Sequence, residues 1–149
     1  MDNNKTKLIA AFPGLGKTYF FNNNIINNKI FKISDSDSSS YSKDPSFPKN
    51  YFEHIDNLIA TNEYDYIFIS THEKVLEYLN TNYKNFLIAI PTLDRKEEML
   101  EIYRKRNNTE AFINLIDINY EKWILEIINK YSNKIYALSK TMFLKDALC

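Results

Sequence analysis

Glycine is nearly absent from this sequence. The 149 residues contain two glycines, Gly14 and Gly16, and both lie in one short loop. Glycine is needed where the backbone angle φ is positive or where a ligand approaches the main chain closely. The presence of both glycines in one loop indicates that this loop is the functional centre of the chain.

Cysteine, long apolar runs and net charge are also scarce. The single cysteine, Cys149, has no partner for an internal disulfide, which favours a reducing setting such as the cytoplasm. Apolar runs such as 86–90 are far too short to cross a bilayer, and Pro13 interrupts the first of them, so no signal peptide is expected. Lysine plus arginine and aspartate plus glutamate both number 19, so no overall charge draws the chain to nucleic acid or to a membrane.

Short apolar runs alternate with helical patterns along the chain. Buried strands are expected at 7–12, 29–33, 64–69, 86–90 and 135–138. Helices are expected at 17–26, 48–61, 73–79, 96–105, 109–116 and 120–131, and a polar loop at 34–46. This alternation is typical of an α/β fold in which helices cover both faces of a parallel sheet.

The length and the lack of an internal repeat predict a single domain over 1–149. The helical segment that follows Pro91, roughly 92–118, is expected to move as a lid.

The loop that contains both glycines follows an apolar strand and opens a helix. Its sequence is Ala11-Phe12-Pro13-Gly14-Leu15-Gly16-Lys17-Thr18. This matches the P-loop pattern G-x-x-x-x-G-K-[ST] in the context that the pattern requires, except that Ala11 replaces the first glycine. The alternative is a Pro-Gly turn that precedes a lysine by chance.

A P-loop predicts a binding site for the phosphates of ATP. The residues expected to hold those phosphates are Pro13, Gly14, Leu15, Gly16, Lys17 and Thr18. Lys17 would reach the β- and γ-phosphates, and the hydroxyl of Thr18 would bind Mg²⁺.

Two carboxylates, Asp35 and Asp37, follow the second predicted strand. Ligands of an open parallel sheet gather at the carboxyl ends of its strands. Asp35 is expected to hold Mg²⁺ through water and Asp37 to accept a proton from the attacking hydroxyl. In this feature the sequence resembles the shikimate-kinase-like branch of small P-loop kinases, in which an Asp-x-Asp after the second strand has these two roles. The alternative is a solvated turn.

The third predicted strand, 64–69, lacks the terminal aspartate that P-loop ATPases and GTPases use to help hold Mg²⁺. It ends in Ser70 and Thr71, and Asp65 precedes its apolar run. The pattern therefore favours a small kinase that uses Asp35 for the metal. Ser70 and Glu73 form a capping box for the next helix.

The two histidines carry no functional signal in the sequence. His72 falls in the first turn of the helix that follows Ser70, where an exposed position is expected, and His54 lies within the second predicted helix. We expect no catalytic role for either side chain.

Arginine is confined to one segment: Arg95, Arg104 and Arg106 are the only arginines in the chain. The guanidinium group suits phosphate oxygens. We expect Arg104 and Arg106 to act on the transferring phosphoryl group, and Arg95 to have a smaller effect. The alternative is a charged amphipathic helix with pairs such as Glu101 and Lys105.

The run 91–108 resembles the strand-Pro-helix-Arg lid of nucleoside monophosphate kinases, guanylate kinase especially. Ile102 stands where such a lid often has an arginine, and Asn107 replaces a glycine.

Taken in order, these features resemble the small P-loop kinases of the nucleoside monophosphate kinase and shikimate-kinase-like class. Nucleotide-kinase-like proteins of bacteriophages and large DNA viruses share the sequence Ala-Phe-Pro-Gly-x-Gly-Lys-Thr. The resemblance implies a three-layer P-loop NTPase fold with a parallel sheet of about five strands and a helical lid. It also implies a location in the cytoplasm, that of the host for a viral protein.

The activity implied is the Mg²⁺-dependent transfer of the γ-phosphoryl group of ATP to a small acceptor, with a (deoxy)nucleoside monophosphate as the expected acceptor. The alternatives are a kinase of a nucleoside, a modified DNA base or another small hydroxyl compound, and a non-catalytic ATP-binding regulator.

Overall fold

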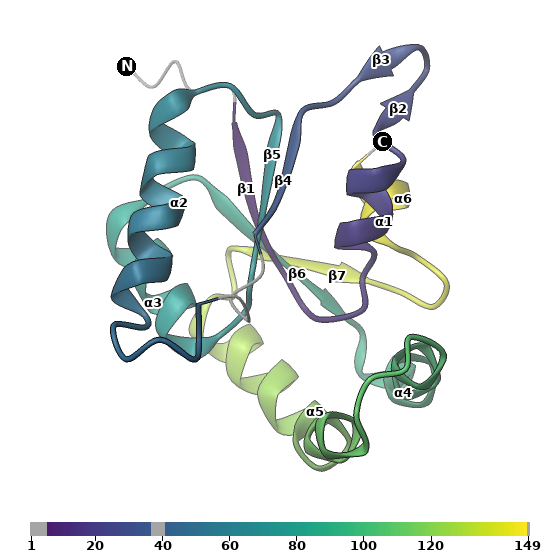
Figure 1. Cartoon of the computed structure of the whole chain (residues 1–149). Coiled ribbons are helices and arrows are strands. Elements are labelled where there is room, and N and C mark those ends of the chain that lie inside the picture. The colour runs from purple at the N-terminus through teal and green to yellow at the C-terminus, as the bar shows by residue number, and fades with distance from the viewer. Residues whose placement is uncertain (1–5, 37–40, 149) are drawn as a thin grey trace.

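The computed structural model describes residues 6–36 and 41–148, and a five-stranded parallel sheet lies at its centre (Figure 1). The strand order is β4-β5-β1-β6-β7, and every neighbouring pair is parallel. The strands are β1 (Lys7–Ala11), β4 (Ile33–Ser36), β5 (Tyr66–Ile69), β6 (Phe86–Pro91) and β7 (Ile135–Leu138). After β1 the chain adds β4 and β5 on one side of it, and then β6 and β7 on the other side. The direction of winding therefore reverses at β1.

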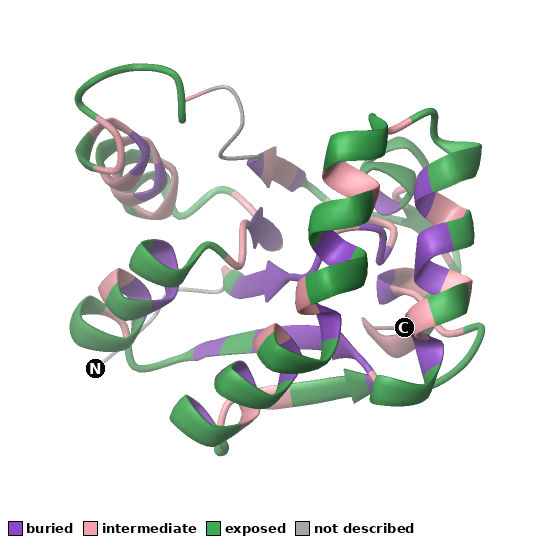
Figure 2. Cartoon of the chain, turned by 90° about the horizontal axis from the view of Figure 1, so that it is seen from below, coloured by how far each residue is buried: buried purple, intermediate pink, exposed green. Residues whose placement is uncertain are grey.

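Helices lie on both faces of this sheet. On one side are α2 (Lys49–Thr61) and α3 (Glu73–Asn82), and on the other are α1 (Lys17–Asn22) and α6 (Leu144–Leu148) (Figure 1). The helices turn exposed residues outward and buried residues toward the sheet (Figure 2). The arrangement is compatible with a three-layer α/β fold.

The connection from β6 to β7 is the longest in the structure and is helical. It consists of the 3-10 turn η2 (Leu93–Arg95), α4 (Lys96–Lys105) and α5 (Glu110–Lys130). A small antiparallel hairpin, β2 (Ile25–Ile26) with β3 (Lys29–Ile30), separates α1 from the sheet strand β4.

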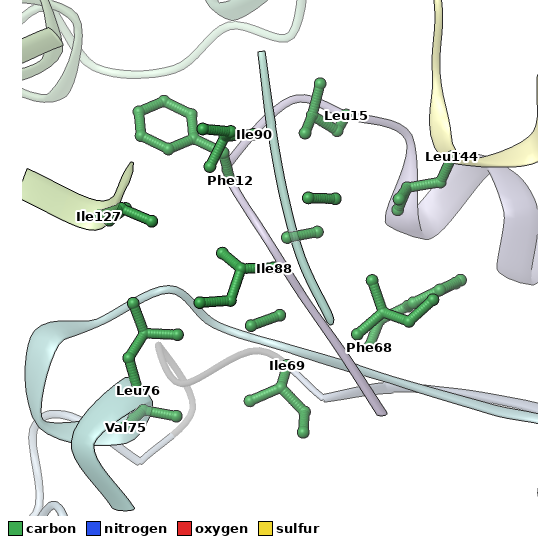
Figure 3. Packing of buried hydrophobic residues seen from close by; sticks show 14 of the residues in the cluster. Phe12, Leu15, Phe68, Ile69, Val75, Leu76, Ile88, Ile90, Ile127 and Leu144 are labelled. Atoms are coloured by element: carbon green, nitrogen blue, oxygen red, sulfur yellow. The ribbon is translucent and has the colours of Figure 1, made fainter. Parts of the chain in front are cut away.

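The core lies on both faces of the central strands. All four residues of β5 are buried. Ile88 packs on the side of Leu76 in α3 and Ile127 in α5, whereas Phe68 faces the side of Leu144 in α6 (Figure 3). Strands covered on both faces read as continuous apolar runs, which is why the sequence revealed them. None of the helices in residues 6–36 and 41–148 is long and apolar enough to cross a membrane.

The predicted α/β fold with a parallel sheet of five strands is confirmed. The helices expected at 48–61 and 96–105 correspond to α2 and α4, and the strand expected at 135–138 is β7.

The helix predicted at 17–26 is wrong beyond Asn22, where α1 ends. Asn27 and Asn28 both have positive φ, 50° and 67°, and they form a two-residue turn of the kind that joins antiparallel strands. This hairpin also divides the strand expected at 29–33. The sheet strand is Ile33–Ser36, so the loop expected at 34–46 begins as a strand.

The two helices predicted at 109–116 and 120–131 are a single helix, α5. The residues between them, Asp117 to Asn119, include no glycine or proline that would break it. The expected capping box of α3 is also wrong. Its N-cap is His72, whose Nδ1 accepts the Lys74 N–H at 3.3 Å, while Ser70 Oγ accepts the His72 N–H at 3.2 Å.

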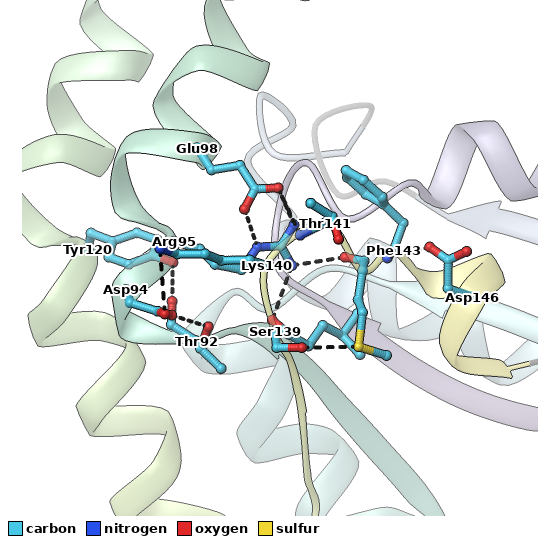
Figure 4. Close-up of polar contacts among 12 residues, drawn as sticks. Thr92, Asp94, Arg95, Glu98, Tyr120, Ser139, Lys140, Thr141, Phe143 and Asp146 are labelled. Atoms are coloured by element: carbon cyan, nitrogen blue, oxygen red, sulfur yellow. Dashed lines mark hydrogen bonds and ion pairs between the residues drawn. The ribbon is translucent and has the colours of Figure 1, made fainter.

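Arg95 is the only fully buried charged side chain among the described residues. Its Nε and Nη2 donate to the two carboxylate oxygens of Glu98 at 2.9 and 2.8 Å, and Nη1 donates to the carbonyls of Leu138 and Met142 at 3.1 and 2.9 Å (Figure 4). The guanidinium group lowers the pKa of Glu98 below its ordinary value, mainly through this hydrogen bonding. Arg95 thereby joins the start of α4 to the chain that follows β7.

We predict that Arg95→Ala lowers the free energy of unfolding by about 3–5 kcal/mol, because it leaves a partly buried carboxylate and two carbonyls without their donor. Urea denaturation measures this change. Arg104→Ala is the control: Arg104 pairs with Glu101 at 3.2 Å with about half of each side chain exposed, so its loss should leave stability nearly unchanged. Equal, small effects of the two exchanges would contradict the structural role of Arg95.

Candidate functional site

The loop between β1 and α1 lies at the carboxyl end of the central strand, where the winding of the sheet reverses. Ligands of open α/β sheets bind at this position. Gly14 and Gly16 both have φ of +89°, a conformation that other residues adopt only with strain. The glycines predicted to mark the functional centre are therefore needed for the shape of this loop.

Three successive amides of the loop have no hydrogen-bond acceptor in the part of the chain that the structure describes. Within the described residues, the N–H groups of Gly14, Leu15 and Gly16 donate no hydrogen bond, although Gly14 and Leu15 are buried residues. Backbone donors in such positions are almost always satisfied. Consecutive donors in a loop of this kind form a concave site suited to an anion.

Lys17 and Thr18, at the start of α1, each donate a side-chain hydrogen bond to another residue of the site. Lys17 Nζ donates to the Ala11 carbonyl at 3.4 Å, across the mouth of its own loop. Thr18 Oγ1 donates to Asp35 Oδ2 at 2.8 Å. Thr18 and Asp35 come from α1 and β4, and the sequence assigned both of them to Mg²⁺. The structure brings the two oxygens into direct contact.

Asp37, predicted as the proton acceptor, lies outside the described residues, and that role stays a prediction. Asp65 lies at the opposite end of the sheet, as the sequence indicated. Its Oδ2 accepts the Lys32 N–H at 2.8 Å, just before β5 begins. Ser70, not a carboxylate, follows β5.

A polar cluster that the sequence did not reveal supports the strand that carries Asp35. The hydroxyl of Tyr51 in α2 donates to the Ser36 carbonyl at 2.5 Å and accepts the Ser70 N–H at 3.2 Å, which links the ends of β4 and β5. Ser36 Oγ lies 2.9 Å from Ser34 Oγ and 3.2 Å from His54 Nε2. Burial lowers the pKa of His54, which favours the neutral ring beside Ser36. The sequence predicted the helix that carries Tyr51, at 48–61, but not these hydrogen bonds.

Helix α4 lies directly against the loop. The hydroxyl of Tyr103 donates to the Pro13 carbonyl at 2.7 Å. A Cβ atom on Gly14 would lie 2.8 Å from Tyr103 Cε1 and 3.0 Å from Met99 Cε. The sequence placed this helix in a lid over the site, but did not reveal that Tyr103 contacts the loop itself.

Arg104 and Arg106 lie one and three residues after Tyr103 and are exposed. Arg104 pairs with Glu101 three residues before it, which differs from the expected pair of Glu101 with Lys105. Within the described residues, no hydrogen bond or ion pair joins either arginine to the loop.

The segment after β7 contacts the loop from the other side. The Leu144 N–H donates to the Leu15 carbonyl at 2.9 Å. A Cβ atom on Gly16 would lie 3.4 Å from Phe143 Cβ, and the Phe143 ring lies 5.4 Å from the Arg95 guanidinium carbon. The sequence carried no signal for this packing, because residues 139–148 match no motif.

The described residues contain no group of three or more His, Cys, Asp or Glu side chains that could hold a metal ion. Mg²⁺ bound with a nucleotide needs no such group, since it keeps several waters and takes one or two protein oxygens together with substrate phosphates. The Thr18 hydroxyl and the Asp35 carboxylate are oxygen ligands of that kind.

We predict that Gly14→Ala destabilises the fold more than Gly16→Ala. Both exchanges place a side chain at positive φ, which costs about 1–2 kcal/mol. Only Gly14→Ala also forces Tyr103 or Met99 to move, which adds about 1–3 kcal/mol of overpacking. Urea denaturation of the two variants compares them directly. Equal losses of stability would show that α4 does not press on the loop at Gly14.

Comparison of the chain with protein-family models, with curated proteins and with solved structures found no match in any of the three.

Proposed function

We propose that this protein is a P-loop phosphotransferase that moves the γ-phosphoryl group of ATP to a small acceptor, with a (deoxy)nucleoside monophosphate as the acceptor. The observation that carries the proposal is the 2.8 Å hydrogen bond between Thr18 and Asp35. It joins the last residue of the loop motif to the carboxylate that the resemblance to small P-loop kinases assigns to Mg²⁺.

The loop supplies the binding groups for the phosphates of ATP. The amides of Gly14, Leu15 and Gly16 are available as donors to phosphate oxygens. Lys17 contributes the positive charge, and its long side chain allows Nζ to move from the Ala11 carbonyl to the β- and γ-phosphates. Most of the catalysis in phosphoryl transfer is positioning and electrostatic stabilisation, and these residues supply both.

Thr18 and Asp35 would hold Mg²⁺, which neutralises charge on the phosphates when it is bound. The lack of a carboxylate after β5 favours a kinase over a P-loop ATPase, because Asp35 is the available acidic ligand. Asp37 remains the proposed proton acceptor for the attacking hydroxyl.

A non-catalytic ATP-binding regulator is the second candidate function. Its support is that Arg104 and Arg106 are exposed and, in the part of the chain that the structure describes, form no hydrogen bond or ion pair with the loop. In the phosphotransferase, the two arginines would turn toward the transferring phosphoryl group once both substrates are bound.

The test of the phosphotransferase is formation of ADP from MgATP in the presence of each common nucleoside monophosphate, and of nucleosides and small hydroxyl compounds. We predict turnover with one acceptor class above the ATP-only rate. Lys17→Ala should lower that turnover, because it removes about 2–4 kcal/mol of transition-state stabilisation. Asp35→Asn should raise the Mg²⁺ concentration for half-maximal turnover at least about tenfold.

Asp117→Asn is the matched control, because it removes a carboxylate that pairs with Lys96 on the surface and to which the sequence assigns no role. Its Mg²⁺ requirement should equal that of the wild type. Binding of MgATP without turnover on any acceptor would favour the regulator, and failure to bind MgATP would contradict both functions.

We further predict that Arg104→Ala or Arg106→Ala lowers kcat by roughly a hundredfold while the Kd for ATP changes far less. An arginine that meets the phosphoryl group only in the transition state contributes to kcat and not to ground-state binding. Steady-state kinetics with the identified acceptor measure both quantities. A near-normal kcat in both variants would show that the C-terminal end of α4 is an ordinary charged surface.

A further inference from the structure

We propose that Tyr103 is a positioning residue of the phosphate-binding loop: its hydroxyl fixes the Pro13–Gly14 peptide so that the Gly14 amide is turned toward the anion. This inference rests on the proposed function, because it concerns how the loop is made ready for phosphate.

The Tyr103 hydroxyl reaches the loop from a side chain that is buried in the protein. Tyr103 is fully buried, and its ring packs edge-on against Phe112 with the centroids 5.2 Å apart. Its hydroxyl donates to the Pro13 carbonyl at 2.7 Å, and its Cε1 atom lies against Gly14. Burial raises the pKa of Tyr103 well above its ordinary value, so the hydroxyl keeps the proton that it donates.

Because the peptide bond is planar, holding the Pro13 carbonyl also fixes the direction of the Gly14 N–H. In a trans peptide the C=O and the following N–H point in opposite directions from one rigid plane. A Pro13 carbonyl held toward Tyr103 therefore turns the Gly14 N–H away from α4. That N–H donates to no group within the described residues.

A second contact fixes the loop in the same manner. The Leu144 N–H donates to the Leu15 carbonyl at 2.9 Å, which turns the Gly16 N–H away from α6. Arg95 supports this contact, since it donates to the carbonyls of Leu138 and Met142, six and two residues before Leu144. Alternate peptides of the loop are thus fixed from two sides, by α4 and by the segment after β7.

Fixing these planes in advance has a direct effect on affinity. A loop whose peptides can flip must be ordered when it binds, and the ordering lowers the affinity. Glycine residues make such flips easy. The hydroxyl of Tyr103 removes part of this cost before the phosphate arrives.

The test is Tyr103→Phe, which removes the hydroxyl and keeps the ring. Tyr120→Phe is the matched control, because Tyr120 is also a buried helical tyrosine and its hydroxyl donates to the Thr92 carbonyl at 2.8 Å. Calorimetry would give the affinities of both variants and of the wild type for MgATP and for inorganic tripolyphosphate, and urea denaturation would give their stabilities.

We expect Tyr103→Phe to weaken both ligands roughly three- to tenfold, the worth of one hydrogen bond. Tyr120→Phe should lose similar stability and keep the wild-type affinity. Equal affinity in the wild type and in Tyr103→Phe, or equal weakening by both exchanges, would overturn the positioning role and leave the proposed function intact. If the wild type binds neither ligand, the proposed function itself fails and the positioning role fails with it.

Discussion

The parallel direction of all five strands is the constraint on which the site depends. Parallel strands end at one edge of the sheet, so the loop after β1 and the carboxylate of β4 come together although β5 lies between their strands. The contact between Thr18 and Asp35 at 2.8 Å is the result. The Tyr51 hydroxyl, which joins the ends of β4 and β5, supports the strand that holds Asp35 in place.

Helix α4 is joined to the rest of the structure near both of its ends. Arg95 fixes its first turn to the chain after β7, and Tyr103, near its other end, is bonded to Pro13. In the proposed phosphotransferase, the exposed side chains of Arg104 and Arg106 would turn toward the phosphoryl group while the helix keeps these contacts. The same contacts explain why the loop needs glycine at position 14, where any side chain would meet Tyr103.

The features that could be predicted from the sequence are those that depend on residues close together in the chain. The buried strands and the loop follow from apolar runs and from a motif with a fixed spacing. The assignment of Asp35 to the same site as Thr18 follows from its place at the carboxyl end of a parallel strand. The burial of Arg95 could not be predicted, because a charged residue is buried only when partners such as Glu98 and distant carbonyls are in place. The Asn27–Asn28 turn was missed because asparagine adopts positive φ less regularly than glycine.

The central claim is that this loop binds the phosphates of ATP. Its most direct test is to follow the amide resonances of the two glycines by NMR. In protein made with isotope-labelled glycine, the amide resonances come from Gly14 and Gly16 alone, because the chain has two glycines. Titration with MgATP should shift both resonances, as each amide gains a phosphate oxygen as its acceptor. Two resonances that stay in place at saturating MgATP would contradict the claim.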